Sequence, residues 1–232
     1  MKNTLYIIAA LLVLFAFTQS TIIDRYIPTK KGSTFTYNQY DRNKNILGYL
    51  ISEVTETTTS EKNTVSKIKQ TFKGKNGDTT KIGFTEYKYE NGSTFLSIED
   101  IIPQQAIRSI EGMQGISITI DADDMEIPIN TKKGDKLKDV IIKITAKKNG
   151  ISLMTINAEV TNITCEGTEE ITTPSGVYSC LVISNNTNIN SGYMKNSAIS
   201  KQWLAKGVGL VKIKNYKNGG HLVSSMELVK EN

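Results

Sequence analysis

Apolar and polar residues alternate along most of this chain, which is the pattern of strands with one buried face. The alternation is clearest in two neighbouring segments, residues 137–147 and 151–161. Their aliphatic positions are Val140, Ile142, Ile144 and Ala146 in the first segment, and Met154, Ile156, Ala158 and Val160 in the second. Asn149 and Gly150 lie between them, and an Asn-Gly step favours a tight hairpin turn. We therefore predict an antiparallel pair with one half-buried face.

The same pattern predicts further strands, and turn residues separate many of them. These strands cover residues 34–40, 46–56, 64–73, 79–89, 94–98, 116–120, 178–184, 198–206, 210–216 and 222–229. Residues 104–110 instead favour one short helix, and the asparagine-rich residues 185–196 favour a polar loop. The predicted fold class is therefore mainly β, a single curved antiparallel sheet or half-barrel with one short helix.

The N-terminus has the three parts of a secretory signal peptide. Lys2 supplies the positive charge, residues 5–17 form an apolar run, and small residues follow at Thr18 and Ser20. The run has 13 residues, whereas a spanning helix needs about 20. We expect a signal peptide over residues 1–20, cleaved after Thr18 or after Ser20, and a single antiparallel β domain over residues 21–232. The mature chain would then have no spanning segment; an uncleaved N-terminal anchor is the alternative.

The charge distribution argues against a nucleic-acid partner. The formal net charge is +5, but the basic residues are mostly scattered lysines, and the arginines are Arg25, Arg42 and Arg108. Nucleic-acid surfaces more often combine clustered arginines with stacking aromatic residues. The lysines therefore indicate solvated strand faces, and we expect no nucleic acid to bind.

Cys165 and Cys180 are the only cysteines, and 14 residues separate them. Outside the cytoplasm an even number of cysteines favours a disulfide. Closing a loop of this length stabilises a fold by about 3 kcal/mol in the chain-entropy model. A metal or catalytic site is the alternative, but such sites usually need more Cys or His ligands nearby. We therefore predict a structural disulfide between Cys165 and Cys180.

Other candidate chemistry is weak. His221 is the only histidine, and the chain has no Gly-x-Ser-x-Gly motif, so a structural histidine is favoured over a triad. The acidic residues fall into two groups, Asp121, Asp123, Asp124 and Glu126, and Glu166, Glu169 and Glu170. The first group departs from calcium-loop spacing and is predicted to be a solvated turn. The second is predicted to be an exposed acidic strand edge. We expect no enzymatic activity, no cofactor and no metal site.

Four stretches together resemble a known family. They are residues 26–32, 127–139, 170–180 and 203–212, which include the turn Thr173-Pro-Ser-Gly176 and the segment Trp203-Leu-Ala-Lys-Gly-Val-Gly209. In this order they resemble secreted β-sheet proteins of Gram-negative bacteria with a domain of unknown function, some of them labelled TapB-like. The resemblance implies a curved sheet, distantly similar to periplasmic lipoprotein carriers, and a periplasmic or extracellular location. It implies no catalytic residues.

Two functions follow as expectations. The first is a non-enzymatic envelope protein that binds a lipid or another apolar ligand on a concave sheet. The alternative is a structural or assembly accessory protein whose sheet edge or face docks another envelope protein.

Overall fold

A computed structural model of the protein describes residues 25–97, 116–190 and 195–232. These residues form one antiparallel sheet of 13 strands and contain no helix. The strands are β1 (Thr34–Asp41), β2 (Ile46–Thr59), β3 (Asn63–Gly74), β4 (Thr79–Glu90), β5 (Ser93–Leu96), β6 (Ile116–Ala122), β7 (Met125–Pro128), β8 (Val140–Lys148), β9 (Ile151–Thr173), β10 (Gly176–Asn190), β11 (Lys195–Ala205), β12 (Gly209–Lys217) and β13 (Leu222–Glu231). The predicted mainly β fold class is confirmed. The predicted helix at 104–110 and the signal peptide lie outside the described residues.

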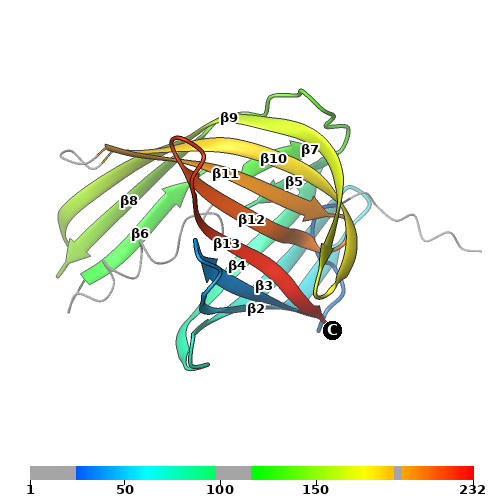
Figure 1. Cartoon of the computed structure of the whole chain (residues 1–232), viewed down its shortest axis with the longest axis horizontal. Coiled ribbons are helices and arrows are strands. Elements are labelled where there is room, and N and C mark those ends of the chain that lie inside the picture. The colour runs from blue at the N-terminus through cyan, green and yellow to red at the C-terminus, as the bar shows by residue number, and fades with distance from the viewer. Residues whose placement is uncertain (1–24, 98–115, 191–194) are drawn as a thin grey trace, which may run out of the picture.

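The strand order is β6-β8-β9-β10-β11-β12-β13-β1-β2-β3-β4-β5-β7. The first and last parts of the chain therefore meet in the middle of the sheet, where β1 pairs with β13. Thr34 and Asn232 exchange two backbone hydrogen bonds of 3.0 Å at this junction. Figure 1 shows the sheet curling, so that β9 and β10 lie across from β2 and β3.

The sheet is open between β6 and β7. These two strands follow one another in the chain, with only Asp123 and Asp124 between them. They nevertheless stand at opposite ends of the strand order, and the described residues form no ladder between them. The sheet is therefore a curved half-barrel with two free edges.

The predicted Asn149-Gly150 turn is confirmed, and Asn91-Gly92 forms a second turn of the same kind. Asn91 and Gly92 have φ angles of 50° and 88° between β4 and β5, and Asn149 and Gly150 have 52° and 81° between β8 and β9. Positive φ at both central residues gives a turn whose twist matches that of the flanking strands. These turns fix the register of each hairpin.

Two segments differ from the sequence prediction. Residues 185–190 continue β10 as a strand between β9 and β11, where a polar loop was predicted. The two flanking ladders satisfy the backbone there, so the polar side chains do not interrupt the strand. Met125–Pro128 forms the short strand β7 against β5, and its proline is tolerated because β7 is an edge strand.

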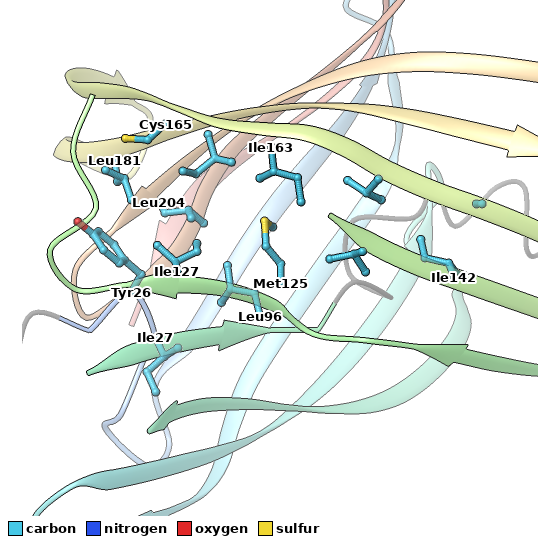
Figure 2. Packing of buried hydrophobic residues seen from close by; sticks show 14 of the residues in the cluster. Tyr26, Ile27, Leu96, Met125, Ile127, Ile142, Ile163, Cys165, Leu181 and Leu204 are labelled. Carbon is cyan, nitrogen blue, oxygen red and sulfur yellow. The ribbon is translucent and has the colours of Figure 1, made fainter. Parts of the chain in front are cut away.

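Two clusters of buried side chains form the core. The Met125 cluster contains Tyr26, Ile27, Leu96, Met125, Ile127, Val140, Ile142, Ile144, Ala158, Val160, Ile163, Cys165, Leu181, Ile183 and Leu204. The Trp203 cluster contains Phe35, Tyr37, Leu50, Val54, Ile68, Phe72, Cys180, Val182, Trp203, Ala205, Val211, Ile213, Met226 and Leu228. Figure 2 shows Met125 and Ile127 of β7 close to Leu204 and Ile163, from strands far along the sheet.

The segment before β1 packs into the core. Tyr26 and Ile27 are buried in the Met125 cluster. The amide of Gly207, in the turn between β11 and β12, donates a 2.8 Å hydrogen bond to the carbonyl of Arg25. A Cβ atom at Gly209 would lie 3.4 Å from the carbonyl oxygen of Tyr26. The Gly207–Gly209 turn is therefore a tight crossing against the segment before β1.

Candidate functional site

Strands β6, β8 and β9 carry an uninterrupted aliphatic surface on one side of the sheet. Its side chains form three rows across the strands: Ala122, Ile142 and Ala158; Ile120, Ile144 and Ile156; and Ile118, Ala146 and Met154. Directly opposed residues in antiparallel strands lie close enough for their side chains to touch. We call these nine residues the aliphatic face.

The aliphatic face is buried on β8, half-buried on β6 and progressively exposed along β9. In the first row Ile142 is 1% exposed and Ala158 is buried with it in the Met125 cluster. In the second row Ile120 and Ile156 are only half-buried. In the third row Met154 is 38% exposed. Along β9 the core therefore continues into side chains that are progressively accessible toward the β8–β9 turn, whereas Ile144 and Ala146 of β8 stay buried.

The other side of these strands is largely polar. Outward-facing residues of β6 are Ser117, Thr119 and Asp121, and all three are exposed. Lys143 of β8 and Asn157 of β9 are paired on the outer side and are also exposed. Ile141, at 64% exposed, is an exception. The alternation predicted for residues 140–160 is therefore confirmed, and it separates an apolar inner side from a solvated outer side.

Two tyrosines of β4 face the same core. Tyr87 and Tyr89 are half-buried and pack against the Met125 cluster, as do Ile118, Ile120 and Ile156 of the aliphatic face. Tyrosine combines a large apolar ring with a polar hydroxyl group. The inner surface therefore has aliphatic side chains from β6, β8 and β9 and aromatic ones from β4.

The predicted disulfide between Cys165 and Cys180 is wrong, because both cysteines are buried free thiols. Cys180 of β10 pairs with Glu169 of β9, and Glu169 lies four residues beyond Cys165, about 13 Å along the strand. A disulfide requires Cα atoms within about 7 Å.

The two thiols also face opposite sides of the sheet. Cys165 pairs with Ile183 and packs with it in the Met125 cluster, whereas Cys180 belongs to the Trp203 cluster. Burial raises the pKa of the Cys180 thiol to about 11, with a further contribution from the charge of Glu169. Cys180 is therefore an unreactive thiol at neutral pH.

The acidic residues around the β6–β7 turn are dispersed. Asp123 and Asp124 are exposed in the turn, and Asp123 lies 4.0 Å from the ammonium group of Lys138. Glu126 accepts a 2.7 Å hydrogen bond from the hydroxyl of Ser93. Among the residues that the structure describes, no group of three or more Asp, Glu, His or Cys side chains could hold a metal ion.

Two acidic residues of β9, Glu166 and Glu169, make structural contacts with side chains of β11. Lys201 lies 2.9 Å from Glu166 and 3.9 Å from Glu169. The bond from Lys201 is the main cause of a lowered Glu166 pKa. Glu169 also accepts a 3.0 Å hydrogen bond from the indole N–H of Trp203. Glu170 is exposed. Of the three residues predicted to form an exposed acidic edge, Glu166 and Glu169 are therefore paired with β11, and only Glu170 matches the prediction.

His221 is exposed in the turn between β12 and β13. Its carbonyl oxygen accepts a 2.9 Å hydrogen bond from the amide of Lys217, which closes the turn. The structure thus gives this residue a backbone role in the turn.

Arg25 is a feature that the sequence prediction missed. Its side chain is only 5% exposed, and its guanidinium lies 4.5 Å from the ring centroid of Tyr89. Its Nη1 group donates to the hydroxyl of Thr64. Burial lowers the pKa of Arg25. No sequence signal marks this residue, because most arginines of globular proteins are exposed.

Comparison with solved structures shows the fold in other bacterial proteins. One from Bacteroides fragilis, provisionally described as an exported protein with a YmcC-like fold, has a TM-score of 0.75 and 20% identity, covering 89% of this chain and 98% of that chain. One from Parabacteroides distasonis, provisionally described as a lipoprotein, has a TM-score of 0.77 and 20% identity over the same shares. No curated protein matches the chain.

These descriptions agree with the periplasmic or extracellular location expected from the signal peptide together with the family resemblance. In the part of the chain that the structure describes, no helix has the length and hydropathy to cross a membrane. The sequence itself matches the DUF3108-like family over residues 30–228. The matching family model does not support the expected TapB-like resemblance. Because it spans most of the chain, the protein belongs to the DUF3108-like family.

Proposed function

We propose that this protein is a non-enzymatic envelope protein that binds a lipid or another apolar ligand on the aliphatic face. The observation that carries the proposal is the gradient of exposure along β9 of that face. Val160 and Ala158 of β9 are buried, Ile156 is half-buried, and Met154 is 38% exposed. A surface made only of aliphatic side chains that remains partly accessible is suited to an apolar ligand.

The physical gain from such a contact is large enough for binding. Each methylene group moved from water into apolar surroundings contributes about 0.8 kcal/mol. An acyl chain with about ten methylenes in contact would gain about 8 kcal/mol before the costs of ordering it.

Two variants of β6 test the proposal. Ile120→Gln places an amide on the aliphatic face, and Thr119→Gln places the same group on the exposed side of the same strand. The mature protein is purified gently, its mass is measured under native conditions, and organic extracts are analysed for lipid. Binding of the uncharged fluorescent probe N-phenyl-1-naphthylamine is titrated in parallel.

We expect stoichiometric lipid and probe binding in the native protein and in Thr119→Gln, and a loss of about tenfold or more in probe affinity for Ile120→Gln, since an unsatisfied amide on an apolar surface is costly. A native protein that is consistently empty of lipid and does not bind the probe would refute the proposal.

A second function is favoured by the free edge of β6. The only ladder of this strand among the described residues is the one with β8. An unpaired edge offers backbone donors and acceptors to a strand of another protein. Two results would favour this docking role over ligand binding. The purified protein would contain no lipid and would co-purify in equal amounts with one envelope protein, and a crosslinker attached at Ser117→Cys on β6 would join the two proteins.

A further inference from the structure

The end of the β8–β9 hairpin projects beyond the neighbouring strand β10. The ladder between β9 and β10 ends where Asn157 pairs with Asn190. Among the described residues, 151–156 of β9 therefore pair only with β8. At about 3.4 Å per residue this projection is about 20 Å long. Figure 1 shows the arrowhead of β8 at the left-hand end of the molecule, away from the C-terminus.

Large aliphatic side chains are exposed at this end, which we call the hairpin tip (residues 147–154). Ile151 is 69% exposed and Leu153 is 57% exposed, and Met154 follows them in β9. Ile151 and Leu153 lie outside the aliphatic face and are not part of the proposed ligand surface. Exposed apolar residues that are rimmed by polar ones mark surfaces that bind a protein or a membrane. These side chains therefore indicate an interaction surface at the hairpin tip.

The charge around the hairpin tip is wholly positive. Lys147 and Lys148 are the only charged residues within 144–158, and residues 116–120 of the paired strand β6 carry no charge. Lys148 is exposed and pairs with Ile151 across the hairpin. Of the described acidic residues, none forms an ion pair with either lysine. The hairpin tip thus combines exposed apolar side chains with two positive charges that an anionic surface would complement.

We propose that the hairpin tip docks on the surface of a bilayer that contains anionic phospholipids. Ile151 and Leu153 enter the boundary between headgroups and acyl chains, and the ammonium groups of Lys147 and Lys148 bind lipid phosphates. Lysine suits this position because its apolar stem follows the neighbouring side chains inward while its charge stays at the headgroups. Each lysine near an anionic bilayer surface strengthens binding about fivefold.

A bilayer suits the hairpin tip better than a protein partner does. Specific protein–protein interfaces take about 20–30 residues from each partner, and a projecting turn offers far fewer. A second copy of the chain is disfavoured, because two tips in contact would bring their lysines together. An anionic bilayer is a fluid surface that accepts a narrow projection and neutralises both lysines.

Binding of the mature protein to vesicles tests the role of charge. One set of vesicles is phosphatidylcholine alone, and the other is equal parts phosphatidylcholine and phosphatidylglycerol. The native protein should co-sediment with the anionic vesicles about tenfold or more tightly. The double substitution Lys147→Gln with Lys148→Gln should weaken that binding about twentyfold.

The matched control removes the same charge far from the hairpin tip. Lys30 and Lys31 are adjacent exposed lysines before β1, whose first residue Thr34 bonds to Asn232 near the C-terminus. Lys30→Gln with Lys31→Gln should leave binding to anionic vesicles within about threefold, since these charges lie away from the bilayer.

Two exposed isoleucines of the same hairpin test the apolar contact. Ile151→Ser should weaken binding to anionic vesicles about tenfold or more. Ile141→Ser, at a residue that is 64% exposed but distant from the turn, should change it by about twofold or less. A nitrobenzoxadiazole group attached at Leu153→Cys should emit at shorter wavelength when anionic vesicles are added, and one at Ile141→Cys should not.

Absence of binding to anionic vesicles, or equal affinity for the two kinds of vesicle, would overturn the proposal. Equal losses in the tip variants and in their controls would also overturn it. Self-association of the native protein that Ile151→Ser abolishes would assign the hairpin tip to a second copy instead. Titration of N-phenyl-1-naphthylamine without vesicles tests the proposed function separately, so either proposal can fail alone.

Discussion

Trp203 of β11 donates its indole N–H to the carboxylate of Glu169 on β9, with an Nε1–Oε2 distance of 3.0 Å. Strand β10 lies between these two strands, so the bond spans a neighbour. Lys201 and Lys214 lie 5.1 and 5.8 Å from the centre of the Trp203 ring system. This buried indole therefore links a hydrogen bond, two cation–π contacts and the Trp203 cluster.

Trp203→Phe should lower the free energy of unfolding by about 2 kcal/mol, because it removes a hydrogen bond to a charged group and weakens the ring contacts. Glu169→Gln keeps an acceptor and should cost about 1 kcal/mol or less. Urea unfolding followed by circular dichroism measures both. Tryptophan fluorescence is unsuitable, because Trp203 is the only tryptophan and Trp203→Phe removes it. Glu170→Gln, at an exposed neighbouring position, is the control. Equal effects of all three changes would contradict the assignment.

Both cysteines should behave as buried thiols. At pH 8 the thiol of Cys180 is protonated, because its pKa is about 11, and alkylation requires the thiolate. We therefore expect slow alkylation of the native protein. Unfolding in urea without a reductant should allow two alkylations, measured by intact mass. Two thiols that react only after reduction would show a disulfide and contradict the structure.

Neighbouring residues of β8 provide a matched test of which face is buried. Ile142 is 1% exposed and Ile141 is 64% exposed. Ile142→Ala should lower the free energy of unfolding by about 2–4 kcal/mol through lost burial and an unfilled cavity. Ile141→Ala should change it by about 0.5 kcal/mol or less. Chemical denaturation measures both, and similar losses would mean that the inner and outer sides of β8 are wrongly assigned.

Gly48 of β2 is required by close backbone packing. A Cβ atom at this position would collide with the carbonyl oxygen of Lys73 on β3, whereas one at Gly83 of β4 would meet nothing within 4 Å. We expect Gly48→Ala to destabilise the fold by more than about 1 kcal/mol. Gly83→Ala should be neutral or stabilising by up to about 1 kcal/mol. The midpoints of thermal and urea unfolding distinguish them; a neutral Gly48→Ala would argue against this β2–β3 register.

Glu166 should make stability depend on pH in the acidic range. Its pKa is lowered from 4.5, mainly by the hydrogen bond from Lys201. A carboxylate with a lowered folded-state pKa stabilises the fold above its unfolded pKa, and this contribution is lost as pH falls through the folded value. Because the side chain is 40% exposed, we expect a contribution of about 1 kcal/mol or less.

The measurement is the free energy of unfolding of the native protein minus that of Glu166→Gln, taken from pH 7 to pH 3. The difference should be constant above pH 4.5, should fall below it, and should shrink at high salt. A difference that is independent of pH would show that the ion pair with Lys201 has no influence on stability.

Much of the sheet could be predicted because its signals are local. Alternating residues show a strand with one buried face, and Asn149 with Gly150 shows where two strands turn. Residues 185–190 were misassigned because side-chain polarity does not show that a strand has neighbours on both sides. Asn185 is buried in β10 despite its amide.

The error over the cysteines has a different origin. Sequence spacing gave their separation along the chain, but the pairing of β9 with β10 depends on register. The register shifts between Val182 and Ile183, which reverses the side toward which Cys165 would otherwise point. The position of Arg25 could not be predicted either, because it depends on packing between the segment before β1 and strands far along the chain.

The short link between β6 and β7 also constrains how the half-barrel can deform. Ala122 ends β6 and Met125 begins β7, so the three intervening Cα–Cα steps span at most about 11 Å. The free edges of β6 and β7 share no hydrogen-bonded ladder among the described residues, but this short link holds them together at one end. The distance between the two edges is therefore limited most closely at Ala122, and less closely at Ile116 at the other end of β6. The less constrained end of β6 is thus the end beside Met154, the most exposed residue of the aliphatic face on β9.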